Sequence, residues 1–120
     1  MTLKEYQLQA MTTCLPESEN FTYMMLNLVG EVGEFASKIA KAIRKDKATI
    51  FYNHLQTEGI YAMTQDEVED LKKEAGDILW QLSGLCTVMG WDLEEVAQEN
   101  LDKLASRKAR NKIDGDGDNR

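Results

Sequence analysis

Apolar residues recur at helical intervals along most of the chain. They return every three or four positions over 3–15, 22–45, 64–90 and 91–109, which is the spacing that places side chains on one face of an α-helix. The single proline, Pro16, lies just after the first stretch, and proline interrupts a helix interior. The pattern predicts an all-α fold, most simply a bundle of four main helices.

Two of these helices have clear start signals. Thr64 followed by Glu67 has the spacing of a capping box, and Asp92 followed by Glu95 repeats it. Gly90 ends the third apolar stretch, at the position where helices commonly terminate in glycine. We therefore expect separate helices on either side of Gly90.

Two segments do not follow the helical pattern. The stretch 46–63 contains Ile50, Phe51 and Leu55 and is too apolar for a free linker, so we expect an insert with a short helix or hairpin of its own. Residues 111–120 are polar and have no periodicity, which predicts a flexible tail. The length of 120 residues indicates one domain over the whole chain.

The composition narrows the function classes. With 14 basic and 21 acidic residues the formal charge is 14 − 21 = −7, which argues against binding a nucleic-acid duplex through a basic surface. Cys14 and Cys86 lie far apart, in no metal-binding spacing, as is typical of a reducing compartment. No apolar run is long enough for a membrane span. We expect a cytoplasmic protein.

Carboxylates occur at the same spacing in two predicted helices. Glu31 and Glu34 are three residues apart in one, and Glu74 and Asp77 in the other, so each pair lies on one helix face beside the apolar stripe. If the helices pack side by side, four anionic groups meet and require a cation. Oxygen ligands select Mg²⁺, Mn²⁺ or Ca²⁺ over zinc, and Mg²⁺ often shares phosphate oxygens of a substrate.

A structural interpretation of the same residues stays open. Glu34 and Lys38 have the i, i+4 spacing of a surface ion pair, and the chain would then be a non-catalytic helical module whose acidic face docks a basic partner. Gly33 and Gly76, each before the second carboxylate, favour a site. A glycine inside a helix costs about 1 kcal/mol relative to alanine, and close approach of a helix or ligand is a usual reason for keeping it.

The last predicted helix offers groups that suit a nucleotide. Asn100 lies within its apolar stripe, and Lys103, Arg107 and Lys108 follow. An amide suits a sugar hydroxyl or a metal-bound water, and the cations suit phosphates. The alternatives are an Asn satisfied by the backbone and cations that stabilise the helix C-terminus.

Three segments, 28–35 (LVGEVGEF), 73–81 (KEAGDILWQ) and 100–108 (NLDKLASRK), resemble the MazG-type nucleoside triphosphate pyrophosphohydrolases. The resemblance implies an all-α fold that binds Mg²⁺ and cleaves NTPs or dNTPs between the α and β phosphates, in nucleotide-pool housekeeping. It also implies a homodimer or homotetramer in which helices of two subunits complete the site.

Carried over by position, the resemblance implies roles for individual residues. The metal ligands are Glu31, Glu34, Glu74 and Asp77; the nucleotide contacts are Asn100, Lys103, Arg107 and Lys108; Glu34, Lys103 and Arg107 act in catalysis. Two features depart from the family pattern. First, Gly30 stands where the family motif has its first glutamate, so either Glu34 acts as the general base or a metal-activated water needs none. Second, the 46–63 insert lengthens the segment between the two acidic pairs.

Overall fold

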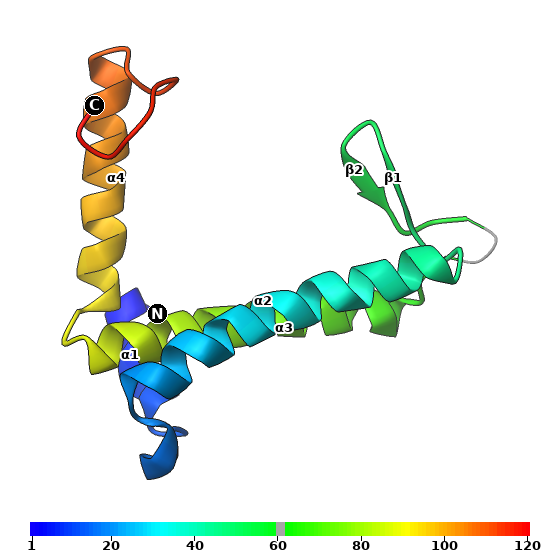
Figure 1. The fold of residues 1–120 in the computed structure, drawn as a ribbon, viewed down its shortest axis with the longest axis horizontal. Helices are drawn as coiled ribbons and strands as arrows, with labels where there is room; N and C mark the ends of the chain where they lie inside the picture. Colours follow the sequence, from blue (N-terminus) through cyan, green and yellow to red (C-terminus); the bar gives the residue numbers. More distant parts are fainter. Residues whose placement is uncertain (60–61) are drawn as a thin grey trace.

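The computed structural model describes residues 1–59 and 62–120 and holds four α-helices and one small hairpin in those ranges (Figure 1). This confirms the predicted all-α class. Within the described residues, no helix combines the length and the apolar character that crossing a membrane requires. In chain order the elements are α1 (Leu3–Met11), the short 3₁₀ helix η1 (Pro16–Ser18), α2 (Phe21–Arg44), β1 (Thr49–Phe51), β2 (His54–Gln56), α3 (Gln65–Val88) and α4 (Leu93–Ala109).

Side-chain caps set the helix starts. The predicted capping box of α3 is confirmed, because Thr64 Oγ1 accepts from the Glu67 amide at 3.1 Å and the Glu67 carboxylate accepts from the Thr64 amide at 3.1 Å. Asp92 caps α4 by accepting from the Glu94 amide at 2.9 Å, one residue earlier than a capping box with Glu95 requires. Each cap satisfies a backbone donor that lacks an intrahelical partner.

The insert contains a hairpin, one of the two alternatives predicted for it. β1 and β2 pair antiparallel, with Ile50 opposite Leu55. Tyr52 and Asn53 form the two-residue turn, with φ of 47° and 64°. Positive φ at both central residues is typical of a type I′ turn, whose twist matches that of the two strands. The predicted insert also includes residues 60 and 61, which lie outside the described residues.

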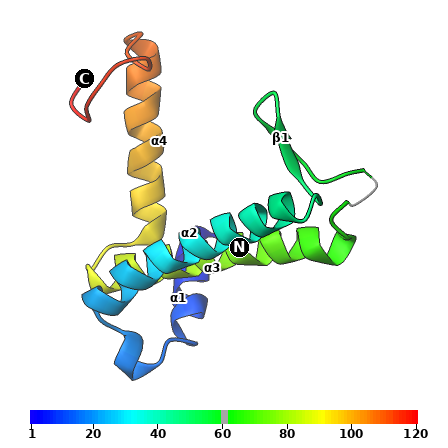
Figure 2. The ribbon, with the colours of Figure 1, turned by 45° about the vertical axis from the view of Figure 1, so that its right-hand side comes forward.

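α2 and α3 run antiparallel and side by side, and α1 packs across α3 (Figures 1 and 2). The Trp80 indole of α3 donates to the Ala10 carbonyl and to Thr13 Oγ1, both at 3.0 Å. Four residues further along α3, Gly84 packs against Met24 of α2, which is fully buried. These contacts fix the rotation of α3 and therefore the face it presents to α2.

α4 leaves the α2–α3 pair and stands away from it in both views (Figures 1 and 2). Its main contacts are with α1 and α3, and Gln7 of α1 accepts from the Leu93 amide at 2.9 Å. The radius of gyration is 17.9 Å, against about 14 Å for a compact domain of this length. Large apolar side chains such as Leu26, Val29 and Leu101 are consequently exposed.

Candidate metal centre

Carboxylates from α2 and α3 converge at the contact between these helices. Glu31 comes from α2, and Glu74 and Asp77 come from successive turns of α3. One carboxylate oxygen of each lies within 4.8 Å of those of the other two. The two acidic pairs seen in the sequence therefore meet through three of their four members.

The donor atoms of this cluster fit a divalent cation. Glu31 Oε2 and Glu74 Oε2 are buried and have no hydrogen-bond partner among the described residues, and Glu74 as a whole is only 8% exposed. A buried acceptor without a partner is costly, so such an atom in a folded protein calls for a ligand, an ion or a water. Carboxylate oxygens are the ligands that hard cations such as Mg²⁺ prefer.

Burial and the neighbouring carboxylates also raise the proton affinity of Glu31. Burial raises the pKa of Glu31 above its ordinary value, and the nearby charges of Glu34, Asp77 and Glu74 raise it further. Tyr6 of α1 lies close enough that Asp77, after burial, raises the pKa of its phenol. The cluster is therefore an electronegative site that a cation stabilises.

Glu34 and Lys38 are placed differently from the sequence expectation. Glu34 is exposed and outside the tight cluster, although near enough to Glu31 to affect its pKa. Lys38 Nζ lies 2.7 Å from Glu74 Oε1 on the other helix, so among the described residues Lys38 does not form the pair with Glu34 that the structural interpretation suggested. A buried carboxylate gains more from a cation than an exposed one does. Lys38 was missed as part of the site, although it lies seven residues after Glu31, on the same face.

The two glycines of the motif do not mark a close helix approach within the described chain. A Cβ built on Gly33 or on Gly76 meets no atom within 4 Å there. Of the two reasons considered for these glycines, close approach of a helix is wrong within the described chain, and close approach of a ligand stays a prediction.

The candidate nucleotide contacts of α4 are not brought to the carboxylates. Asn100 and Lys108 are exposed, and the C-terminal half of α4 stands apart from the α2–α3 pair (Figure 1). Asn100 is therefore not a core amide, one of the alternatives considered for it. Arg107 is only 4% exposed, and Lys103 Nζ lies 3.3 Å from an Asp118 carboxylate oxygen.

Residues 111–120, predicted to be flexible, fold back on α4. Arg107 Nη2 donates to the Asp118 carbonyl at 2.8 Å and to the Gly117 carbonyl at 3.3 Å. Arg120 donates to the carbonyls of Lys112, Ile113 and Gly117 at 2.9, 3.1 and 2.6 Å. The basic end of α4 is thus occupied by the chain's own C-terminal segment.

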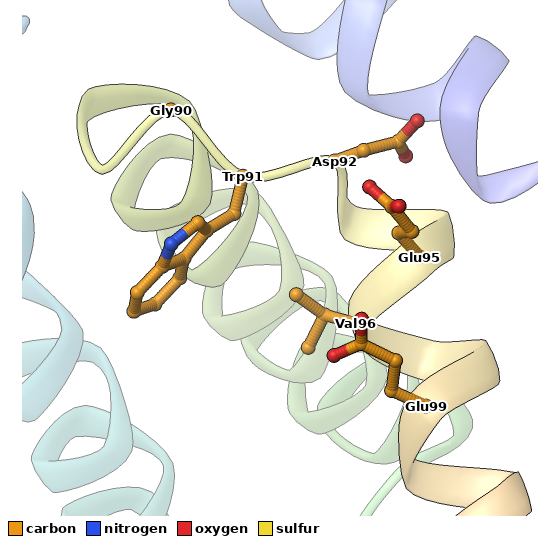
Figure 3. A pocket seen from close by; sticks show the side chains of 6 residues that line it. All are labelled: Gly90, Trp91, Asp92, Glu95, Val96 and Glu99. Atoms are coloured by element: carbon orange, nitrogen blue, oxygen red, sulfur yellow. The ribbon is translucent and has the colours of Figure 1, made fainter.

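A pocket at the turn between α3 and α4 has a different character. In Figure 3 the Trp91 indole lies on one side of Val96, and the carboxylates of Asp92 and Glu95 lie on the other. Glu99 adds a third carboxylate to this lining. An acidic wall repels phosphates, so this pocket is unsuited to a triphosphate.

Comparison with known proteins identifies the family of the chain. The "Gene 37 protein" of Mycobacterium phage L5 is 38% identical over 102 residues, which are 85% of this chain and 78% of that protein. No solved structure matches the chain. A family model of the MazG nucleotide pyrophosphohydrolase domain matches residues 19–111, a span that includes α2, α3 and α4 with all of the clustered carboxylates. On this match, the chain belongs to the MazG nucleotide pyrophosphohydrolase family.

Proposed function

We propose that the protein hydrolyses nucleoside or deoxynucleoside triphosphates between the α and β phosphates, releasing a monophosphate and pyrophosphate. The observation that carries the proposal is the convergence of Glu31, Glu74 and Asp77 within 4.8 Å. Membership of the family supports the reaction class. The cofactor is Mg²⁺, with Mn²⁺ as the alternative, and the role is housekeeping of the cytoplasmic nucleotide pool by the single domain formed by residues 1–120.

The carboxylates divide into two roles. Glu31, Glu74 and Asp77 hold the cation, because their oxygens share one site and two of them are buried without a partner. When bound, the cation supplies positive charge that neutralises the triphosphate and lowers the pKa of an attacking water. Glu34 is exposed beside Glu31, so it is free to accept the proton of that water, in place of the family glutamate that is Gly30 here.

The α4 residues complete the site from a second copy of the chain. Within one chain α4 contacts α1 and α3 and stands away from the carboxylates, so Asn100, Lys103, Arg107 and Lys108 would serve the site of a partner subunit. For Lys103 and Arg107 this requires that the C-terminal segment, which now pairs with them, moves aside. The exposed apolar side chains of α2 and α4, such as Val29 and Leu101, support a homodimer or homotetramer. A monomer by light scattering at micromolar concentration would contradict this assembly.

An assay of each NTP and dNTP with Mg²⁺ tests the activity. Monophosphate and pyrophosphate should appear, and Asp77→Asn should abolish them while the circular dichroism spectrum stays unchanged. Glu69→Gln is the matched control, because Glu69 is an exposed acid of the same helix outside the cluster, and it should retain activity. Release of single phosphates would refute the proposed cleavage position.

A thermal-shift measurement separates this proposal from a non-catalytic module with an acidic docking face. An enzyme of the proposed kind is stabilised by Mg²⁺ together with a non-hydrolysable dNTP, since ligands that bind the native state raise its melting temperature. A docking module shows neither that stabilisation nor hydrolysis. It instead binds a basic partner in a salt-sensitive manner.

A further inference from the structure

A lysine-rich pocket is lined by residues from the end of α2 and the start of α3. These two helix ends lie next to the hairpin (Figure 1). Its charged lining consists of Lys38, Lys41, Lys45, Lys47, Glu67 and Asp70. Residues 38–47 carry five of the 14 basic residues in the chain. In a protein with a formal charge of −7, this concentration of cations singles out the pocket as a place for an anion.

Only part of this positive charge is neutralised by the chain itself. Lys47 Nζ lies 3.0 Å from both carboxylate oxygens of Glu67, and Asp70 is 3.5 Å from Lys73. Lys41 and Lys45 have no ion-pair partner among the described residues. The pocket therefore presents two uncompensated ammonium groups.

The pocket adjoins the carboxylate cluster. Lys38 lines the pocket and also lies 2.7 Å from Glu74 Oε1, so one side chain joins the two places. Lys38 lies seven residues after Glu31, and Lys45 lies seven residues after Lys38. Residues at this spacing share a helix face. The pocket and the carboxylate cluster therefore lie along one face of α2, with Lys38 between them.

We propose that this pocket binds the terminal phosphates of the triphosphate, and the pyrophosphate formed from them, through Lys41 and Lys45. The identity of the substrate rests on the proposed function, whereas the binding of pyrophosphate does not. Lysine is a mobile point charge that suits phosphate oxygens. The carboxylates of Glu67 and Asp70 also line the pocket. Because they restrict the area of positive charge, the pocket favours a compact anion over an extended nucleic-acid backbone.

Titration calorimetry with inorganic pyrophosphate and Mg²⁺, at about 0.15 M salt, tests the pocket directly. The double variant Lys41→Gln/Lys45→Gln should bind pyrophosphate at least about tenfold more weakly, because two charged hydrogen-bond donors are lost. The matched control is Lys72→Gln/Lys112→Gln, which removes the same charge from two exposed lysines outside the pocket. Its affinity should stay within about twofold of the unaltered protein.

Equal affinity of the pocket variant and the unaltered protein would overturn the proposal, and so would equal weakening by the control variant. The titration requires no turnover. If no triphosphate is hydrolysed, but the pocket variant binds pyrophosphate more weakly and the control variant does not, the proposed function fails and the anion site stands. If triphosphates are hydrolysed and the pocket variant keeps its KM and its inhibition by pyrophosphate, the function stands and the anion site fails.

Discussion

Lys38 of α2 and Glu74 of α3 form a 2.7 Å ion pair that joins the two helices beside the carboxylate cluster. The lysine side chain is 45% exposed and the glutamate side chain only 11%. The pair therefore supplies a partner to one oxygen of a nearly buried carboxylate and leaves its second oxygen, Oε2, without one. When no divalent cation is bound, the ammonium group of Lys38 supplies a positive charge to the acidic cluster through Glu74.

Replacing Lys38 by methionine should destabilise the protein chiefly when no divalent cation is present. The nearly buried carboxylate of Glu74 would lose the partner of its Oε1 atom, so the free energy of unfolding should fall. Urea denaturation in EDTA, at fixed protein concentration, measures this loss, and Mg²⁺ should restore most of it. Lys73→Met is the control, because the Lys73–Asp70 pair is exposed, and its effect should be small. Equal stability of both variants in EDTA would contradict this prediction.

Glu31→Gln should stabilise the protein without metal and remove its response to metal. Burial and the neighbouring carboxylates raise the pKa of Glu31 above 4.5 in the folded state, so the folded chain holds this proton more tightly than the unfolded chain. Its contribution to stability is therefore lost as the pH rises from 4.5 through the raised folded-state pKa. The glutamine variant has no such loss.

Melting curves from about pH 4, just below the ordinary glutamate pKa, to about pH 8 test the Glu31 prediction in EDTA and in Mg²⁺. At neutral pH in EDTA, Glu31→Gln should melt above the unaltered protein, and its Mg²⁺-induced shift should be much smaller. Glu69→Gln, outside the cluster, should keep the full shift. A variant at Glu31 that melts lower in EDTA, or that responds normally to Mg²⁺, would refute the role assigned to this carboxylate.

Asp118→Asn should loosen the C-terminal segment. The Lys103 hydrogen bond and charge, followed by those of Arg107, lower the pKa of Asp118 below 3.8. The stabilisation from Asp118 is therefore complete above pH 3.8 and is lost as the pH falls through the lower folded-state pKa. At neutral pH the variant should exchange its amide hydrogens over 111–120 faster than the unaltered protein does. Asp114→Asn makes the same charge change four residues earlier, and equal exchange in both variants would contradict the prediction.

Gly84→Ala should disrupt the contact between α2 and α3. A Cβ at this position would overlap the fully buried Met24 side chain, and such overpacking costs about 1–3 kcal/mol of stability. Gly30→Ala is the control, since its Cβ would make only an ordinary contact, 3.7 Å from Asn27 Oδ1, and alanine favours a helix by about 0.5–1 kcal/mol. Denaturation midpoints should therefore move in opposite directions.

The sequence by itself determined the helices and the acidic pairs. Apolar spacing located the four α-helices of the described residues, and local cap chemistry placed the start of α3 at Thr64. Glu31 and Glu34 are three residues apart, as are Glu74 and Asp77. The helical period alone therefore places each pair on one helix face. These features depend on residues close together in the chain, which is why a single sequence was sufficient to predict them.

Only the tertiary structure decided which charged groups meet. Lys38 pairs with Glu74 instead of Glu34 because packing of α2 on α3 buries Glu74 and leaves Glu34 in solvent. Arg107 lies under a C-terminal segment that composition alone predicts to be flexible, because carbonyls ten and eleven residues away accept its hydrogen bonds. Both outcomes depend on burial produced by contacts between elements, and helical periodicity carries no information about such contacts.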